Sequence, residues 1–407
     1  MAQQVTVIGG GFSGLTVAYY LLRAGVGVRL LEREGRTGGL VGTRRTPEGL
    51  VETAANGILN SGRLEAMCRE IGVTLERPRR ESRARYIWRG RPRRFPLTVT
   101  ETLRVGGGLI GNVGRWRPHP EETIAAWGGR ILGQGATEYG LVTALGGIYA
   151  GDGHRLSASL ILGPRERAGS GEQTARPTVR GTVAPRGGMQ ELIDGLTHWV
   201  ERAGARIEYQ QRAEVDPDCP TVVCTSAREA AACLGPAAPA VGEALRQIEM
   251  LSLVTVTAFY AREAGDLPGF GCLFPRDQGF RARGVLFNDS IFEGRSSFRS
   301  ETWIFGGAHD PGIVDLDEAA LGEIVACDRT RMTGRAGAPI ALYATRWPAA
   351  LPHYDVGLER TLAGLPPLPP RVRLAGNYLG GIGLARILDR SARVASEMAA
   401  LLTGRPV

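Results

Sequence analysis

The stretch VTVIGGGFSG (Val5–Gly14), with the apolar run Leu15–Arg23 directly after it, decides the fold of this 407-residue chain. Its first four residues are mostly β-branched and predict a strand, and the run after the glycines predicts a helix that ends before Gly25. A second strand is predicted at Val28–Leu31, with Glu32 directly behind it. A strand, a helix and a second strand so close together are typical of a parallel βαβ unit.

The glycines between the first strand and the helix form the pattern G-x-G-x-x-G, over Gly9–Gly14. They let backbone N–H groups approach a pyrophosphate at the positive end of the helix. Glu32 stands where a carboxylate accepts hydrogen bonds from ribose hydroxyls. The run from Glu32 to the Gly-Gly pair at 38–39 resembles the FAD-binding signature of the large flavoprotein group that contains amine oxidases, phytoene desaturases and protoporphyrinogen oxidases, and a glycine-rich turn at 376–383 supports this resemblance. No second such pattern follows a strand, so we expect no separate NAD(P)H domain.

Arginine alone carries the positive charge. The chain has 49 Lys plus Arg against 41 Asp plus Glu, a net charge of +8, and no lysine. A Schiff base, a lysine general base and a Walker-type phosphate lysine are therefore excluded. Nine of the arginines crowd residues 77–94, beside Tyr86, Trp88 and Phe95. Within a flavoenzyme frame, this favours a solvated face or a membrane-facing rim and argues against a nucleic-acid surface.

The rest of the sequence predicts a helical region, a long loop and the cellular compartment of the protein. Residues 97–165 are predicted to be mostly helical and 163–187 to form a polar loop. Six cysteines without a C-x-x-C pair, and scattered histidines, predict neither a disulfide framework nor a metal site and suit a reducing compartment. We expect a cytoplasmic protein with no signal peptide and no spanning helix. Peripheral contact with an anionic membrane surface is left open.

Alternating apolar stretches predict antiparallel strands at Leu251–Tyr260, Gly284–Phe287 and Glu301–Phe305. The chain is predicted to end with a strand at Val372–Ala375 and a helix at Ser391–Leu402.

Four further segments resemble the protoporphyrinogen oxidase family, within the flavoprotein superfamily that also contains amine oxidases and phytoene desaturases. Their order and spacing fit the family over nearly the whole chain. Amine oxidases of this group usually keep a lysine near the flavin, and this chain has none. The segments are RYIWRG (Arg85–Gly90), GIYAGD (Gly147–Asp152), RWP with LPHY (Arg346–Pro348 and Leu351–Tyr354) and GNYLGGIGL (Gly376–Leu384).

The resemblance implies an α/β fold with three parts. One is a Rossmann-like FAD-binding domain of the p-hydroxybenzoate hydroxylase type. The second is an α+β substrate domain on an antiparallel sheet, and the third is a helical, membrane-associated insertion. The FAD-binding domain is expected from 1–75, 185–235 and 367–407, the substrate domain from 76–96 and 236–366, and the helical insertion from 97–184.

The resemblance also implies site residues. Arg85 would hold a substrate propionate, and the backbone carbonyl of Gly147 would face the macrocycle. No acid–base residue and no metal ligand is implied, because the substrate hydride passes to flavin N5. The apolar walls are expected from Phe270, Leu273, Leu286 and Ile304. FAD is expected to contact Gly9, Gly10, Gly11, Phe12, Ser13, Gly14, Glu32, Arg33, Gly39, Leu40, Ala54, Ala55, Asn56, Gly57, Val215, Trp347, Ile382, Gly383 and Leu384.

The activity implied is the FAD-dependent, six-electron oxidation of protoporphyrinogen IX to protoporphyrin IX in heme synthesis, with oxygen as acceptor and hydrogen peroxide as product. Coproporphyrinogen III, with four propionates, stays open as the substrate because arginine is so abundant. The sequence departs from the family pattern at Ala54-Ala55, at Ala385–Ile387 and between Val215 and Thr221. A non-catalytic homologue that binds FAD or porphyrin therefore stays open as an alternative. A homodimer is also left open.

Overall fold

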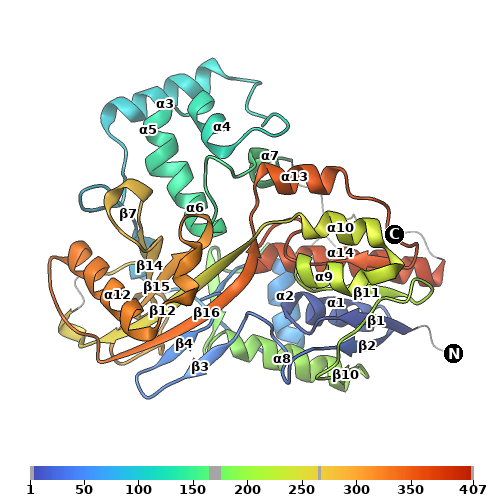
Figure 1. Cartoon of the computed structure of the whole chain (residues 1–407). Helices are drawn as coiled ribbons and strands as arrows, with labels where there is room; N and C mark the ends of the chain where they lie inside the picture. Colours follow the sequence, from blue (N-terminus) through green and yellow to red (C-terminus); the bar gives the residue numbers. More distant parts are fainter. Residues whose placement is uncertain (1–3, 165–175, 265–266, 405–407) are drawn as a thin grey trace.

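A computed structural model describes residues 4–164, 176–264 and 267–404 (Figure 1). A five-stranded sheet with the spatial order β10-β2-β1-β11-β17 is parallel throughout. The predicted βαβ unit forms its centre, because α1 (Phe12–Arg23) connects β1 to β2. The strands are β1 (Gln4–Ile8), β2 (Gly27–Leu31), β10 (Arg206–Glu208), β11 (Thr221–Val223) and β17 (Val372–Leu374).

Helices cover both faces of this sheet, as in doubly wound α/β folds. Helices α1, α8 (Met189–Arg202) and α14 (Leu384–Thr403) share one apolar core with Val5 and Val7 of β1. On the other face, Ile8 packs with α9 (Ala227–Leu234) and α10 (Pro239–Arg246). The last helix begins at Leu384 and not at the predicted Ser391, because its first turn follows directly on the glycine-rich turn that ends at Gly383.

A seven-stranded sheet forms the other half of the molecule, with the order β16-β12-β15-β14-β13-β7-β8. Its neighbouring strands are antiparallel except for β13 and β7. Helix α12 (Glu318–Thr333) packs against one face, where Leu321 and Val325 meet Trp303 and Phe305. The predicted antiparallel strands are therefore confirmed. The bounds are β7 (Arg85–Trp88), β8 (Pro92–Arg93), β12 (Met250–Tyr260), β13 (Gly271–Leu273), β14 (Gly284–Phe287), β15 (Arg299–Gly306) and β16 (Ala341–Pro352).

The predicted helical region lies beside both sheets (Figure 1). No helix among the described residues is long and apolar enough to cross a bilayer. Its helices are α3 (Val99–Gly111), α4 (Ile124–Ile131), α5 (Gln134–Ala136), the π-helical turn η2 (Thr137–Val142), α6 (Thr143–Tyr149) and α7 (Ala158–Leu162). The remaining helices are α2 (Gly62–Glu70), α11 (Asn288–Ile291) and α13 (Val356–Ala363).

The prediction of one continuous loop over 163–187 is wrong at its end. Thr182–Pro185 form strand β9, which pairs with β5 (Ile58–Leu59) and β6 (Leu75–Glu76). The partners lie more than a hundred residues earlier, so no local pattern marks this strand. Residues 165–175 of the predicted loop lie outside the described residues. A separate two-stranded ribbon joins β3 (Thr43–Arg45) to β4 (Leu50–Glu52).

Candidate active site

The glycine-rich turn is shaped by close backbone contacts. A Cβ at Gly14 would lie 1.8 Å from the carbonyl oxygen of Gly9, so only glycine fits there. Gly9 itself has φ +101°, a conformation that favours glycine. Helix α1 starts immediately after Gly11, and the first N–H groups of a helix have no partner inside it. The turn therefore presents free backbone donors and the positive end of the helix to an anionic pyrophosphate.

Glu32 is fixed at the end of β2 by backbone donors. Its carboxylate accepts hydrogen bonds from the N–H of Gly10 at 2.6 Å and of Glu34 at 2.7 Å. The Gly38 N–H donates to the Gly10 carbonyl at 2.9 Å, which carries the Gly-Gly pair across the turn beside Gly11. The carboxylate, the helix end and the Gly38-Gly39 segment together form the cradle that FAD requires for its ribose and pyrophosphate.

Two more of the expected FAD contacts meet at α9. The guanidinium of Arg33 lies 3.0 Å from a carboxylate oxygen of Glu229, so its charge is already paired. The N–H of Val215 donates to the Cys233 carbonyl at 2.8 Å. An adenine contact through the Val215 backbone would therefore use its carbonyl oxygen.

The remaining FAD candidates join the two sheets. Trp347 of β16 donates its indole N–H to the Thr53 carbonyl at 2.7 Å, and the Thr53 hydroxyl donates to the Leu40 carbonyl at 2.8 Å. Leu40 and the half-exposed segment 54–57 are thus tied to the second sheet. On the other side, the hydroxyl of Ser13 in α1 donates to the Ala375 carbonyl, just before the glycine turn that leads to Ile382–Leu384.

Strand register places the substrate candidates on one face of the seven-stranded sheet. Arg85 and Leu286 both pair with Gly271, and Leu273 and Ile304 lie opposite one another on the two sides of β14. Residues paired directly across neighbouring strands point to the same face. The three apolar side chains are half-buried, whereas the opposite face is buried under α12. The sequence alone could not predict that these side chains share a face, because this depends on pairing between strands that are distant in the chain.

This face reaches from the FAD candidates to Arg85. Ile304 pairs with Thr255 of β12, which pairs with Thr345 of β16, two residues before Trp347. At the other end, the Arg85 guanidinium lies 4.4 Å from the centre of the Phe270 ring. Helix α6 packs against β13 on this face.

Gly147 of α6 rests directly on the apolar wall. A Cβ at Gly147 would lie 2.6 Å from Leu273 Cδ2, so this contact needs glycine or a shift of the leucine side chain. The neighbouring carbonyls of Gly146 and Gly151 each accept a hydrogen bond from Arg283 at 2.8 Å. Burial, which weighs most, lowers the pKa of Arg283 to about 10, a value that still leaves it charged at neutral pH. Arg283 thus anchors the segment that carries Gly147.

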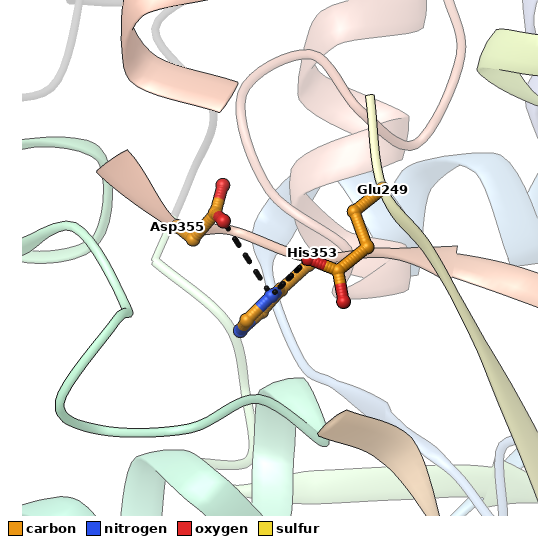
Figure 2. A group of neighbouring side chains, drawn as sticks. All are labelled: Glu249, His353 and Asp355. Atoms are coloured by element: carbon orange, nitrogen blue, oxygen red, sulfur yellow. Dashed lines mark hydrogen bonds and ion pairs between the residues drawn. The ribbon is translucent and has the colours of Figure 1, made fainter. Parts of the chain in front are cut away.

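His353 lies in the LPHY segment, and the sequence predicts no function for it. It is fully buried, and its Nδ1 lies 3.2 Å from Glu249 and 3.6 Å from Asp355 (Figure 2). Its Nε2 accepts the Asp152 N–H at 3.3 Å, so Nδ1 carries the proton. Atoms of Glu249, His353 and Asp355 lie close enough together to hold a metal ion, but the Arg155 guanidinium already bridges the two carboxylates. We interpret this cluster as a structural network of hydrogen bonds and ion pairs and not as a metal centre.

Tyr354 joins three of the four motifs. Its ring lies 5.3 Å from that of Tyr149 in the GIYAGD segment. Its hydroxyl donates to the Asn377 carbonyl and accepts the Gly381 N–H, both at 2.7 Å. Burial raises the pKa of Tyr354, so the phenol stays protonated and can donate. Sequence reasoning missed this residue, because nothing local indicates that the three segments meet.

This combination of a dinucleotide cradle and a half-exposed apolar face defines a flavoprotein oxidoreductase. The chain belongs to the flavin-containing amine oxidoreductase family, whose model matches residues 12–385. It binds FAD and is an FAD-dependent oxidoreductase.

Individual relatives narrow the comparison. The chain is 26% identical to the chloroplastic protoporphyrinogen oxidase of Nicotiana tabacum, over 98% of this chain and 85% of the relative. It is 25% identical to the coproporphyrinogen III oxidase of Mycobacterium bovis, over 96% of each chain. Among solved structures, an Exiguobacterium sp. 255-15 protein assigned as protoporphyrinogen oxidase matches with a TM-score of 0.78 and 22% identity, over 98% of this chain and 99% of the other. The predicted resemblance is confirmed.

Proposed function

We propose that this protein oxidises protoporphyrinogen IX to protoporphyrin IX with oxygen as the acceptor. The observation that carries the proposal is the single face that runs from Trp347, beside the FAD segment, to Arg85. Such a face suits a flat apolar macrocycle with carboxylates at one edge. The near full-length similarity to protoporphyrinogen oxidases supports the same substrate class.

The residues of this face act by positioning. When bound, FAD supplies the acceptor for a hydride from the substrate. In this proposal Leu273, Leu286 and Ile304 supply the apolar wall, Gly147 lets α6 approach it, and Arg85 holds a propionate. Three rounds transfer six electrons and six protons, so three oxygen molecules become three of hydrogen peroxide. Orientation accelerates such a transfer without a protein acid or base.

Coproporphyrinogen III is a second candidate substrate that one observation favours. Arg85 belongs to a cavity lined by five arginines, and coproporphyrinogen carries four propionates whereas protoporphyrinogen carries two. The chemistry at the flavin would be the same for both substrates. Rates for the two porphyrinogens, measured side by side on one preparation, decide between them.

The test uses FAD-loaded protein and freshly reduced porphyrinogens under air. We expect porphyrin fluorescence to appear together with three equivalents of oxygen consumed and three of peroxide formed. Protein stripped of FAD is the control for spontaneous oxidation. If protein saturated with FAD accelerates neither reaction, it is instead the non-catalytic homologue.

We also propose that the protein is cytoplasmic and that α3 rests on anionic membranes. Val99, Leu103 and Ile110 are exposed at helical spacing along this helix, and Arg104 and Arg115 are exposed nearby. Sedimentation with anionic vesicles should retain the wild type and release a Leu103→Glu/Ile110→Glu variant. Equal binding of both proteins, or binding only to neutral vesicles, would contradict this placement.

A further inference from the structure

A cavity of about 460 Å³ opens beside Arg85, and arginine dominates its wall. Arg77, Arg79, Arg83 and Arg85 come from the segment before and at the start of β7, and Arg180 comes from the segment before β9. These two segments are about a hundred residues apart in the chain. The cavity therefore concentrates positive charge that the sequence distributes over separate regions.

The described part of the chain offers few carboxylates to the charge in this cavity. Of the five arginines, only Arg79 has a carboxylate partner within the described residues, at 3.6 Å from Glu81. Arg77, Arg83, Arg85 and Arg180 are all exposed. Like charges around one opening repel one another and create a positive potential that attracts anions.

The cavity adjoins both the cofactor segment and the substrate face. Phe270 and Arg85, which end the apolar face, also line it. Thr182 also lines the cavity and would lie 2.8 Å from a Cβ at Gly57, which ends the FAD segment that starts beside Trp347. The four peptide units from Thr53 to Gly57 span at most about 14 Å, so the cavity lies near the residue that Trp347 contacts.

We infer that this cavity binds substrate carboxylates beyond the one held by Arg85, with Arg83 and Arg180 as specificity-determining residues for porphyrinogens that carry more than two propionates. The inference rests on the proposed function, because it places a porphyrinogen on the adjoining face. Each guanidinium presents a planar pair of donors that fits a carboxylate. Protoporphyrinogen carries propionates on two of its four pyrrole rings and coproporphyrinogen on all four, so only coproporphyrinogen presents a carboxylate to these arginines whichever edge of the ring faces the cavity.

The test compares ligands of the same ring system on FAD-loaded protein. Coproporphyrin III carries four carboxylates and protoporphyrin IX carries two, and binding of each is followed by porphyrin fluorescence. We expect the Arg83→Gln/Arg180→Gln variant to bind coproporphyrin about tenfold more weakly and protoporphyrin less than threefold more weakly. The ratio of kcat/KM for the two porphyrinogens should shift in the same direction.

The matched control is Arg202→Gln/Arg228→Gln, which removes the same charge from exposed positions on α8 and α9 outside the cavity. This variant should bind both porphyrins like the wild type. Equal weakening of the two porphyrins by the cavity variant, or none, overturns the specificity assignment whether or not the protein turns over. Absence of turnover by the wild type with intact, selective coproporphyrin binding overturns the proposed oxidation and leaves the cavity assignment standing.

Discussion

The ion pair between Arg295 and Glu52 gives a sharp prediction about what holds the FAD segment in place. Both side chains are about 5% exposed or less, and their closest N and O atoms lie 2.5 Å apart. Glu52 also accepts hydrogen bonds from the Thr43 hydroxyl and the Met189 N–H. It directly precedes Thr53, which bonds Trp347, so the pair fixes the start of the segment expected to contact FAD.

Replacing Arg295 with methionine leaves a buried carboxylate without its cation. Breaking a buried pair in this way costs about 3–5 kcal/mol of unfolding free energy. Burial is the largest influence on Glu52 and raises its pKa, while Arg295 pulls it down. A carboxyl whose pKa is higher in the folded than in the unfolded protein binds its proton more tightly when folded. It therefore stabilises the fold at low pH, and this stabilisation is lost as the pH rises. Without Arg295 the pKa rises further, and the deficit should be larger at pH 7.5 than at pH 5.

Urea unfolding of FAD-loaded protein at both pH values measures this difference. A Glu52→Gln/Arg295→Met variant removes both charges, and we expect it to recover about 1–3 kcal/mol of the loss at pH 7.5. A single variant that loses less than about 1 kcal/mol, or a deficit independent of pH, would refute the reasoning. If the single variant does not accumulate, recovery of soluble protein by the double variant tests the same coupling.

Three further predictions concern the turn, the substrate and pH. Gly14→Ala should abolish stoichiometric flavin absorbance, because its Cβ would lie 1.8 Å from a backbone oxygen, whereas Gly35→Ala, with open space around it, should keep FAD. Arg85→Ala should raise the porphyrinogen KM five- to thirtyfold, about 1–2 kcal/mol for an exposed contact, with FAD content unchanged; an unchanged KM would place Arg85 outside the site. Burial, followed by the nearby Arg283 charge, lowers the pKa of His309 to about 4, so the stability it provides should be lost as the pH falls from about 6.5 towards 4. His309→Gln should flatten that part of the stability profile, and an unaltered profile would show that other groups cause it.

The sequence predicts the FAD cradle well because its determinants are local. Gly9 and Gly14 must be glycine for reasons set by the turn itself, and Glu32 follows β2 directly. The antiparallel strands were also visible as alternating apolar stretches. Strand β9 was not, because it consists of Thr182–Pro185 and acquires its structure by pairing with strands far earlier in the chain.

The sequence by itself determined the parallel βαβ unit, the FAD-type turn and a cationic chain whose only strong base is arginine. Only the tertiary structure decided which residues share a site. Pairing across β13, β14 and β15 aligned Arg85 with the apolar wall, and packing brought Arg180 to the same cavity. Tyr354 likewise joins segments that are distant in the chain. The physical reason is that backbone constraints act between neighbouring residues, whereas strand register and cavity lining depend on contacts between residues far apart in sequence.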